Sequence, residues 1–403
     1  MKEFSNNYMG KIDKIESRFS IKFSHRVFFT ENVFSQKNKV LKNILNSFDA
    51  QSKALFIIDE SVAAHYKNLF SDIENYFRTN QLKTALIDEP ILLPGGEQVK
   101  NNLDILLRLL SAIEKNHLDR HSYLIAIGGG ATLDIAGFAA AIAHRGIRHI
   151  RIPTTTLSQC DSGVGIKNGL NLFGKKNFVG TFYPPLAVIN DFNFLDSLPE
   201  RDKRCGFAEA VKVALIKANA FFQKIQSVAD RLVSFHKPTV KSVIKESARL
   251  HIDHIINGGD PFEMGNSKPL DFGHWSAHKL EDLSNYELKH GEAVAIGIAL
   301  DSIYCYNAGL IKDFDAIKTI IQLLQKLGFK TYTPELEQKD SSGNLALLQG
   351  IEEFREHLGG KLSITLITEI GKSIEVDRMN PLLIEKSIRQ LKEFQTLYNQ
   401  NDF

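Results

Sequence analysis

Short β-rich runs alternate with amphipathic segments through the first half of this chain, and this alternation constrains the fold more than any other feature. Each run is apolar and is bounded by turn or helix signals, as expected for a strand buried on both faces. Strands that alternate with helices form a parallel sheet flanked by helices, so we expect an α/β fold here. The expected strands are 54–59, 84–88, 123–127, 149–152 and 187–191.

The second half has a different texture, because long helical patterns begin just after Leu198. This change predicts two domains, an α/β domain over 1–198 and a mostly α-helical domain over 199–403. The predicted helices are 201–222, 238–256, 268–283, 290–308 and 311–327, followed by a β pair at 362–368 and 373–376. Residues 338–344 are expected to form a polar loop and 398–403 a frayed tail.

Composition excludes several classes of function. Of the 403 residues, 43% are hydrophobic, which is ample for two cores, and the net charge of +2 carries no polyanion-binding signature. We therefore expect no nucleic acid and no membrane partner. The three cysteines are widely spaced and the N-terminus lacks an apolar signal region, so we expect a cytoplasmic protein without disulfides.

Three histidines in the second half have the spacing of metal ligands. In a helix from 274 to 283, His274 and His278 would share one face, and His290 opens the next apolar run. Catalytic zinc takes three protein ligands and keeps one position open, so two of these histidines with the Glu209 carboxylate would suffice. By itself the pattern fits equally a pair of hydrogen-bonded histidines between packed helices.

Two glycine-bearing segments of the first half could bind a nucleotide. The run 125–134 predicts a strand that enters glycines 128–130 and then a helix, which suits a pyrophosphate at the helix N-terminus. The segment 94–100 offers Glu97 for ribose hydroxyls and Lys100 for phosphate. A plain tight turn and a solvated hairpin are the alternative interpretations of these two segments.

Polar groups suited to chemistry gather between 144 and 182, in a run rich in glycine that predicts a loop. Cationic and amide side chains at this density suit a polyhydroxylated phosphate ester. Lys167 and Arg145 would counter phosphate charge, while Asn171 or Asn177 would bind hydroxyls.

Together these motifs resemble the 3-dehydroquinate synthase superfamily, the sugar phosphate cyclases, in order and spacing from roughly 54 to 376. The resemblance implies a dinucleotide domain, a helical zinc- and substrate-binding domain, a cleft between them, a small-molecule sugar phosphate as ligand and a homodimer. The motifs that carry it are glycines 128–130 with Asp134, 145–146, 153–155, 161–167, 174–177, 208–212, 273–274 and 290–294.

The resemblance also assigns roles by position. Glu209, His274 and His290 match the ligands of Zn²⁺ or Co²⁺, which leaves His278 near the phosphate as an acid or base. The positions that match NAD contacts are Asp59, Glu97, Lys100, Gly129, Gly130, Asp134, Thr154, Thr155, Lys176 and Ser197. Those that match catalytic or phosphate contacts are Arg145, Asp161, Lys167, Asn177 and Lys212.

Departures from the dehydroquinate pattern bear on the substrate. Asp271 stands where those enzymes carry an amide, and His357 stands where they carry a lysine. A second anion beside a substrate carboxylate costs energy, whereas an aspartate accepts hydrogen bonds from neutral hydroxyls. In Asp271, His357 and the segments 161–171 and 261–263, the chain is similar to 2-epi-5-epi-valiolone synthases, which cyclise sedoheptulose 7-phosphate. Asn171 and Lys268 are expected to be further substrate contacts.

The reaction implied is transient oxidation by NAD, elimination of phosphate, re-reduction and intramolecular aldol closure, so the enzyme is a carbon–oxygen lyase by outcome. Four alternatives stay open. They are a 3-dehydroquinate synthase, a sister cyclase giving another valiolone epimer, an alcohol dehydrogenase of the glycerol dehydrogenase kind, and a catalytically dead binding protein.

Overall fold

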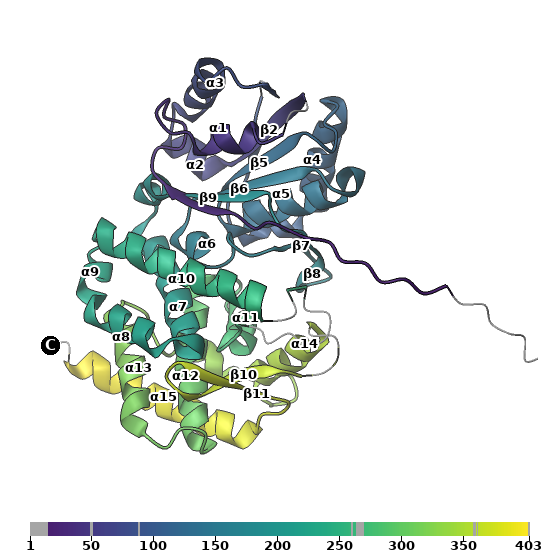
Figure 1. Ribbon diagram of the computed structural model, residues 1–403. Helices are drawn as coiled ribbons and strands as arrows, with labels where there is room; N and C mark the ends of the chain where they lie inside the picture. Colours follow the sequence, from purple (N-terminus) through teal and green to yellow (C-terminus); the bar gives the residue numbers. More distant parts are fainter. Residues whose placement is uncertain are drawn as a thin grey trace, which may run out of the picture.

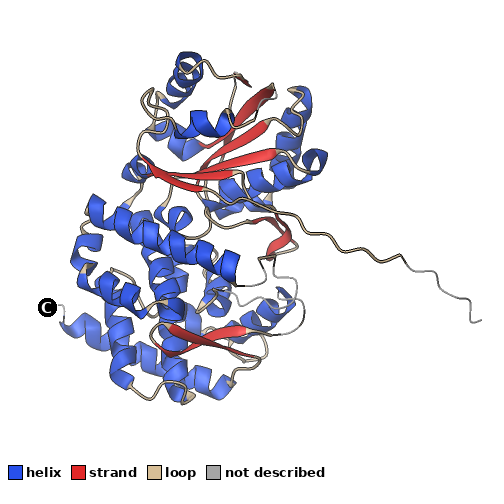
Figure 2. Ribbon diagram, in the orientation of Figure 1, coloured by secondary structure: helices blue, strands red, loops and turns tan. Residues whose placement is uncertain are grey.

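The computed structural model describes residues 15–48, 51–87, 89–258, 261–262, 270–357, 360 and 362–401. A sheet-bearing half lies above a mostly helical half, and a β hairpin lies at their junction (Figures 1 and 2). No helix among these residues combines the length and the apolarity needed to cross a membrane.

The main sheet is parallel in every described pairing and has the strand order β1-β9-β6-β5-β2-β3, with β4 also paired to β2. This confirms the predicted parallel sheet. Four of the five predicted strands lie within a residue or two of their expected positions, and the fifth ends at Leu86, with Asp88 outside the described residues. The strands are β1 (Val27–Thr30), β2 (Ser52–Asp59), β3 (Thr84–Leu86), β4 (Ile91–Leu93), β5 (Tyr123–Gly128), β6 (Arg148–Pro153) and β9 (Ala187–Asp191).

Helices cover both faces of this sheet, which explains why its central strands are apolar throughout. In β2, Phe56 and Ile58 pack with one set of helices, while Leu55 and Ile57 pack with the other. The first set is α1 (Val40–Leu45), α2 (Glu60–His65) and α3 (Leu69–Thr79), and the second is α4 (Leu103–Lys115) and α5 (Gly130–Ile142). Short helical turns complete this half: η1 (Glu97–Asn101), η2 (Ala143–Arg145), α6 (Thr156–Cys160) and η3 (Phe192–Ser197).

The helical half encloses a single large apolar cluster built around α7 and α12. Its helices are α7 (Glu200–Lys217), α8 (Asn219–Ser227), α9 (Ala229–Val233), α10 (Lys237–Asn257), α11 (His274–Leu283), α12 (His290–Asn307), α13 (Phe314–Lys326), η4 (Pro334–Glu337), η5 (Ala346–Leu348), α14 (Gln349–His357) and α15 (Pro381–Asn401). The predicted β pair is present as β10 (Ile364–Glu369) and β11 (Lys372–Val376), which are antiparallel. The chain passes from sheet to helices between η3 and α7, so we keep the boundary near 198 as a proposal.

Three predictions need correction. The segment predicted as a loop contains an antiparallel hairpin, β7 (Lys167–Leu172) and β8 (Lys175–Phe182). The helix predicted over 201–222 is interrupted at Ala218, whose extended backbone separates α7 from α8. The expected frayed tail is helical as far as Asn401, as the last part of α15.

Candidate active site

Helices α11 and α12 carry the three histidines with metal-ligand spacing, and His274 and His290 are their first residues. α11 begins at His274 and ends at Leu283. Of the helix predicted over 268–283, residues 270–273 are not helical, while 268–269 lie outside the described residues. Its N-cap, Gly273, has φ 81°, a conformation that glycine adopts without steric cost. A Cβ on Gly297 of α12 would lie only 2.1 Å from the Gly273 carbonyl oxygen, so the two helices approach closely there. This close packing brings His274 next to His290.

Glu209 of α7 completes this group. Its Oε1 atom lies 3.4 Å from His290 Nε2 and 3.7 Å from His274 Nε2. Ligands about 2.0–2.1 Å from a tetrahedral metal are roughly 3.3 Å apart, so these separations suit an ion between the three atoms. Glu209 is 2% exposed, and a buried carboxylate needs a partner of this kind.

His278 offers a different ligand set. Nitrogen atoms of His274, His278 and His290 also lie within 4.8 Å of one another. Burial, reinforced by the nearby charge of Lys176, holds the pKa of His278 well below its usual range. His278 is therefore neutral at physiological pH. We favour Glu209 as the third ligand, because a carboxylate offsets the charge of a divalent ion.

Lys212 links this group to the sheet-bearing half. Its ammonium lies 3.0 Å from Asp161 Oδ2 and 2.5 Å from Glu209 Oε2. Burial opposes its charge, but Asp161 and Glu209 outweigh burial and raise the pKa of Lys212. His251 of α10 lies 3.5 Å from the same Asp161 oxygen. Lys212 therefore holds Glu209 in its ionised form, the form that binds a cation.

Glu281 of α11 belongs to the site, although the sequence did not single it out. Its Oε2 atom accepts a hydrogen bond from His290 Nδ1 at 3.0 Å. Burial opposes its ionisation, but the neighbouring His290 and Lys176 hold the pKa of Glu281 below its usual range. Burial lowers the pKa of His290, yet Glu281 raises it to about 9. The spacing of 274, 278 and 281 along one helix face was the available signal.

The carboxyl ends of β2, β5 and β6 gather the groups predicted to hold a nucleotide. Asp59 ends β2 and accepts the Ser61 amide at 2.9 Å, which caps α2. Gly129 is the N-cap of α5 and makes no side-chain cap, so the first amides of this helix face the sheet edge. Thr154 and Thr155 follow β6, and Thr155 caps α6.

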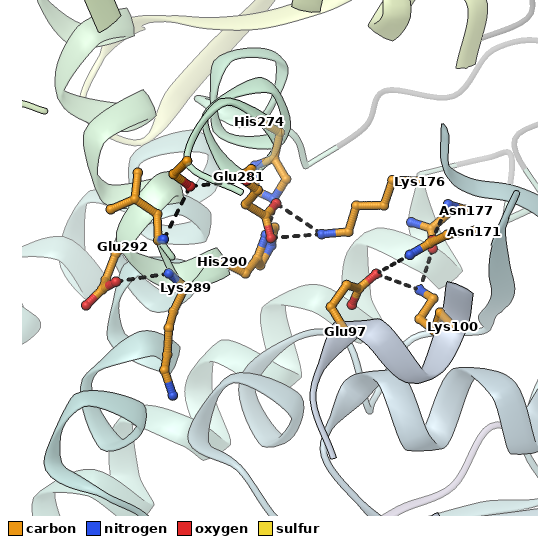
Figure 3. Close-up of polar contacts among 12 residues, drawn as sticks. Glu97, Lys100, Asn171, Lys176, Asn177, His274, Glu281, Lys289, His290 and Glu292 are labelled. Atoms are coloured by element: carbon orange, nitrogen blue, oxygen red, sulfur yellow. Dashed lines mark hydrogen bonds and ion pairs between the residues drawn. The ribbon is translucent and has the colours of Figure 1, made fainter. Parts of the chain in front are cut away.

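A second polar group adjoins this edge and includes buried Lys100. Lys100 Nζ donates to Asp134 Oδ2 at 2.8 Å and to Asn177 Oδ1, and lies 3.6 Å from Glu97. Asn171 Nδ2 donates to Glu97 Oε1 at 3.1 Å. Figure 3 shows Lys176 between this group and the Glu281–His290 pair. The structure therefore brings into contact predicted residues that lie 77 positions apart in the sequence.

Several other predicted residues have different surroundings or lie outside the described part of the chain. Among the described contacts, the exposed Arg145 makes no hydrogen bond or ion pair with a site residue, and Ser197 Oγ donates to the Phe194 carbonyl. Lys167 lies with its ammonium 6.0 Å from the centre of the Phe182 ring. Lys268 and the side chain of His357 lie outside the described part of the chain.

Fold and site together define a class of protein. One half is an α/β sheet with a glycine turn at Gly129, and the other half is helical and holds a candidate set of metal ligands. Residues 90–205 match the model of the 3-dehydroquinate synthase N-terminal region, and residues 206–348 match that of the C-terminal region. The chain belongs to the 3-dehydroquinate synthase family.

Relatives across most of the chain agree with this assignment. A 3-dehydroquinate synthase of Coxiella burnetii (strain Dugway 5J108-111) is 31% identical over 91% of this chain and 94% of its own length. One from Alkaliphilus metalliredigens is 36% identical over 80% of this chain and 86% of its own.

Solved structures share the fold. A 2-epi-5-epi-valiolone synthase from Streptomyces hygroscopicus subsp. jinggangensis, solved with NAD⁺ and Zn²⁺, has a TM-score of 0.82 at 24% identity and covers 94% of this chain and 99% of its own. A 2-deoxy-scyllo-inosose synthase with carbaglucose-6-phosphate, NAD⁺ and Co²⁺ has a TM-score of 0.74 at 24% identity, covering 90% and 96%.

Proposed function

We propose that this protein is a sugar phosphate cyclase that converts sedoheptulose 7-phosphate into 2-epi-5-epi-valiolone and phosphate, with NAD and a divalent metal ion as cofactors. The observation that carries the choice of substrate is the carboxylate of Asp271 beside the candidate metal ligands. Its charge acts on both Lys212 and His274, and its carbonyl accepts the His274 amide at 2.9 Å.

The charges near this aspartate favour a neutral sugar end. Asp161 and Glu209 form ion pairs with Lys212, and the charge of Asp271 also acts on it. Lys212 is the one cation among these four groups. A divalent ion would balance the remaining two negative charges and leave no surplus positive charge. A substrate carboxylate would then be repelled by Asp271, whereas a hydroxyl can donate a hydrogen bond to it.

The chain's donor atoms fit both proposed cofactors. Glu209, His274 and His290 would hold Zn²⁺ or Co²⁺, since two nitrogens and one carboxylate oxygen at these separations suit either ion. The uncapped N-terminus of α5 at Gly129 and Gly130 would receive the pyrophosphate of NAD. When bound, NAD accepts and returns a hydride while the metal ion polarises the sugar hydroxyl.

The protein's own residues would move the protons and bind the phosphate. Neutral His278 lies beside His274 and His290, with ring centres 5.5 and 5.8 Å away, and suits a base that takes a proton as phosphate leaves. Lys167 would counter phosphate charge. Lys212 would keep Glu209 and Asp161 ionised, and its two ion pairs favour this role over the predicted direct phosphate contact. We also propose, from the family resemblance, that the enzyme is a homodimer.

A second candidate, 3-dehydroquinate synthase, is supported by the names of relatives that are 30–36% identical. Sister cyclases that give another valiolone epimer share the substrate proposed here. The proposed sedoheptulose 7-phosphate cyclase and a 3-dehydroquinate synthase differ in whether the substrate carries a carboxylate. The charge of Asp271 would disfavour a substrate that does.

Purified protein with NAD and Zn²⁺ should be given sedoheptulose 7-phosphate and, separately, 3-deoxy-arabino-heptulosonate 7-phosphate. Phosphate release from the first alone, without net NADH, would establish the proposed function, and NMR of the carbocycle would identify the epimer. Release from the second alone would make the protein a 3-dehydroquinate synthase. Net NADH with neither cyclic product would point to an alcohol dehydrogenase.

A further inference from the structure

The carboxylate of Glu281 is shared by two groups from different halves of the protein. On one side it accepts a hydrogen bond from His290 Nδ1 at 3.0 Å. On the other, both of its oxygens accept from Lys176 Nζ, each at 3.0 Å. Lys176 belongs to β8 of the hairpin, 105 residues before Glu281 in the sequence. Figure 3 shows these contacts as a continuous row from His290 through Glu281 to Lys176.

The contact with His290 determines which ring nitrogen is available to a metal. An ionised carboxylate only accepts hydrogen bonds, so His290 Nδ1 must carry the proton. The lone pair of the neutral ring then lies on Nε2, the atom 3.4 Å from Glu209 Oε1. Carboxylates that bind the far nitrogen of a metal-ligating histidine orient its ring and raise its basicity.

The contact with Lys176 restrains the carboxylate itself. Glu281 is 3% exposed, so water does not replace the lysine as a partner on most of its surface. An ammonium equidistant from both oxygens holds the carboxylate against rotation and compensates its buried charge. Loss of Lys176 would free Glu281 to turn away from His290.

The neighbouring hairpin lysine forms a contact of a different kind. Lys175 pairs with Glu356 of α14, and these side chains are 51% and 56% exposed. Exposed ion pairs contribute little to stability, so this one ties the hairpin to the helical half only weakly. Lys175 therefore provides a matched control, with the same residue type on the same strand and no contact with the candidate metal ligands.

We propose that Lys176 and Glu281 are a positioning pair that orients His290 and thereby sets the metal affinity of the site. The inference rests on the proposed metal centre of Glu209, His274 and His290. The family resemblance assigns Lys176 to the binding of the dinucleotide. The inference gives Lys176 a second role, which is to position a candidate metal ligand. Because Lys176 also lies near Glu97, one hairpin residue would connect the nucleotide side of the site to the metal side.

The test measures zinc affinity of the metal-stripped full-length protein by competition with a chromophoric chelator. We expect Glu281→Gln and Lys176→Met each to weaken zinc binding about 10- to 100-fold. Lys176→Arg, which can still bind both carboxylate oxygens, should restore affinity to within a few-fold, and Lys175→Met should leave it unchanged. Circular dichroism of each variant checks that the fold is retained, and Lys176→Met serves if Glu281→Gln does not fold.

Three results would overturn the inference, and only the last of them would also remove the proposed metal centre. If Lys176→Met and Glu281→Gln bind zinc as tightly as the parent while His274→Ala does not bind it, the pair is a structural tie only. Faster amide exchange in the β7–β8 hairpin without a change in zinc affinity would likewise reduce the pair to a structural tie. If the parent protein itself binds no zinc or cobalt, the proposed metal centre fails together with the inference.

Discussion

Asp301 of α12 accepts the indole N–H of Trp275, with its two oxygens 3.0 and 3.2 Å from Nε1. One of these oxygens also accepts the Gly273 amide at 3.0 Å. A single buried carboxyl group thus fixes both residues that flank His274. Burial outweighs these hydrogen bonds and raises the pKa of Asp301 to about 7.

This shift predicts a pH dependence of stability. The Asp301 pKa is 3.8 when unfolded and about 7 when folded, so the stabilisation is complete below pH 3.8 and is lost as pH rises through 7. The loss for this fully buried group amounts to up to about 4 kcal/mol. Asp301→Asn should remove this part of the pH slope, measured as the difference in free energy of unfolding by urea at pH 5 and pH 8. The exposed Asp315→Asn is the control, and an unchanged slope in Asp301→Asn would contradict the assignment.

Two histidine variants discriminate between the candidate ligand sets. We expect His274→Ala to lose bound metal and turnover together, because it removes a ligand common to both sets. His278→Ala should retain metal if Glu209 is the third ligand, while losing activity through the missing base. Metal content of the purified variants by mass spectrometry checks this. A metal-free His278→Ala would assign the site to the three histidines.

Asp271→Asn tests recognition of the sugar end. Loss of the charge should raise the Michaelis constant for sedoheptulose 7-phosphate, since a hydroxyl donates more strongly to a carboxylate than to an amide. Inhibition by inorganic phosphate should remain near its original value, because the proposed phosphate contact is Lys167 and not Asp271. Steady-state kinetics with both ligands provide the comparison, and an unchanged Michaelis constant would exclude the role given to Asp271.

Gly137 of α5 is expected to tolerate no side chain. A Cβ there would lie 1.7 Å from Asn168 Oδ1, an atom that accepts a hydrogen bond from Arg151 at 2.7 Å. Gly137→Ala should cost about 1–3 kcal/mol by overpacking, although alanine normally favours helices. Gly129→Ala is the control for stability, because its Cβ would meet Thr155 at 3.4 Å, an ordinary contact. Equal unfolding midpoints for the two variants would refute the expectation.

The sheet was predictable because its central strands are buried on both faces and therefore apolar throughout. The hairpin was not, because 167–182 contains mostly glycine, asparagine and lysine. Its strands form because Leu170 and Val179 pack on the α5 side of the sheet, a contact that local sequence does not reveal. The four-residue β1 and three-residue β4 are too short for their alternation to be recognised.

The candidate metal ligands were predictable only in part. Helical spacing indicates His274 and His278, and Glu209 was named as a candidate carboxylate, but the choice of His290 over His278 came only from the family resemblance. Glu281 shares a helix face with both histidines, yet an acidic residue on a helix is most often solvated. Only the folded structure shows that Lys176 of β8 contacts Glu281.

The contact between Gly273 and Gly297 limits how this enzyme can be redesigned. Substrate preference could be altered by exchanging Asp271, which sits in a turn just before α11. Gly273 cannot be exchanged to alter substrate preference, because a Cβ there would lie 2.5 Å from the Ile298 backbone nitrogen of α12. Libraries that vary this segment should therefore hold both glycines constant, so that altered specificity is not confounded with a displaced metal ligand.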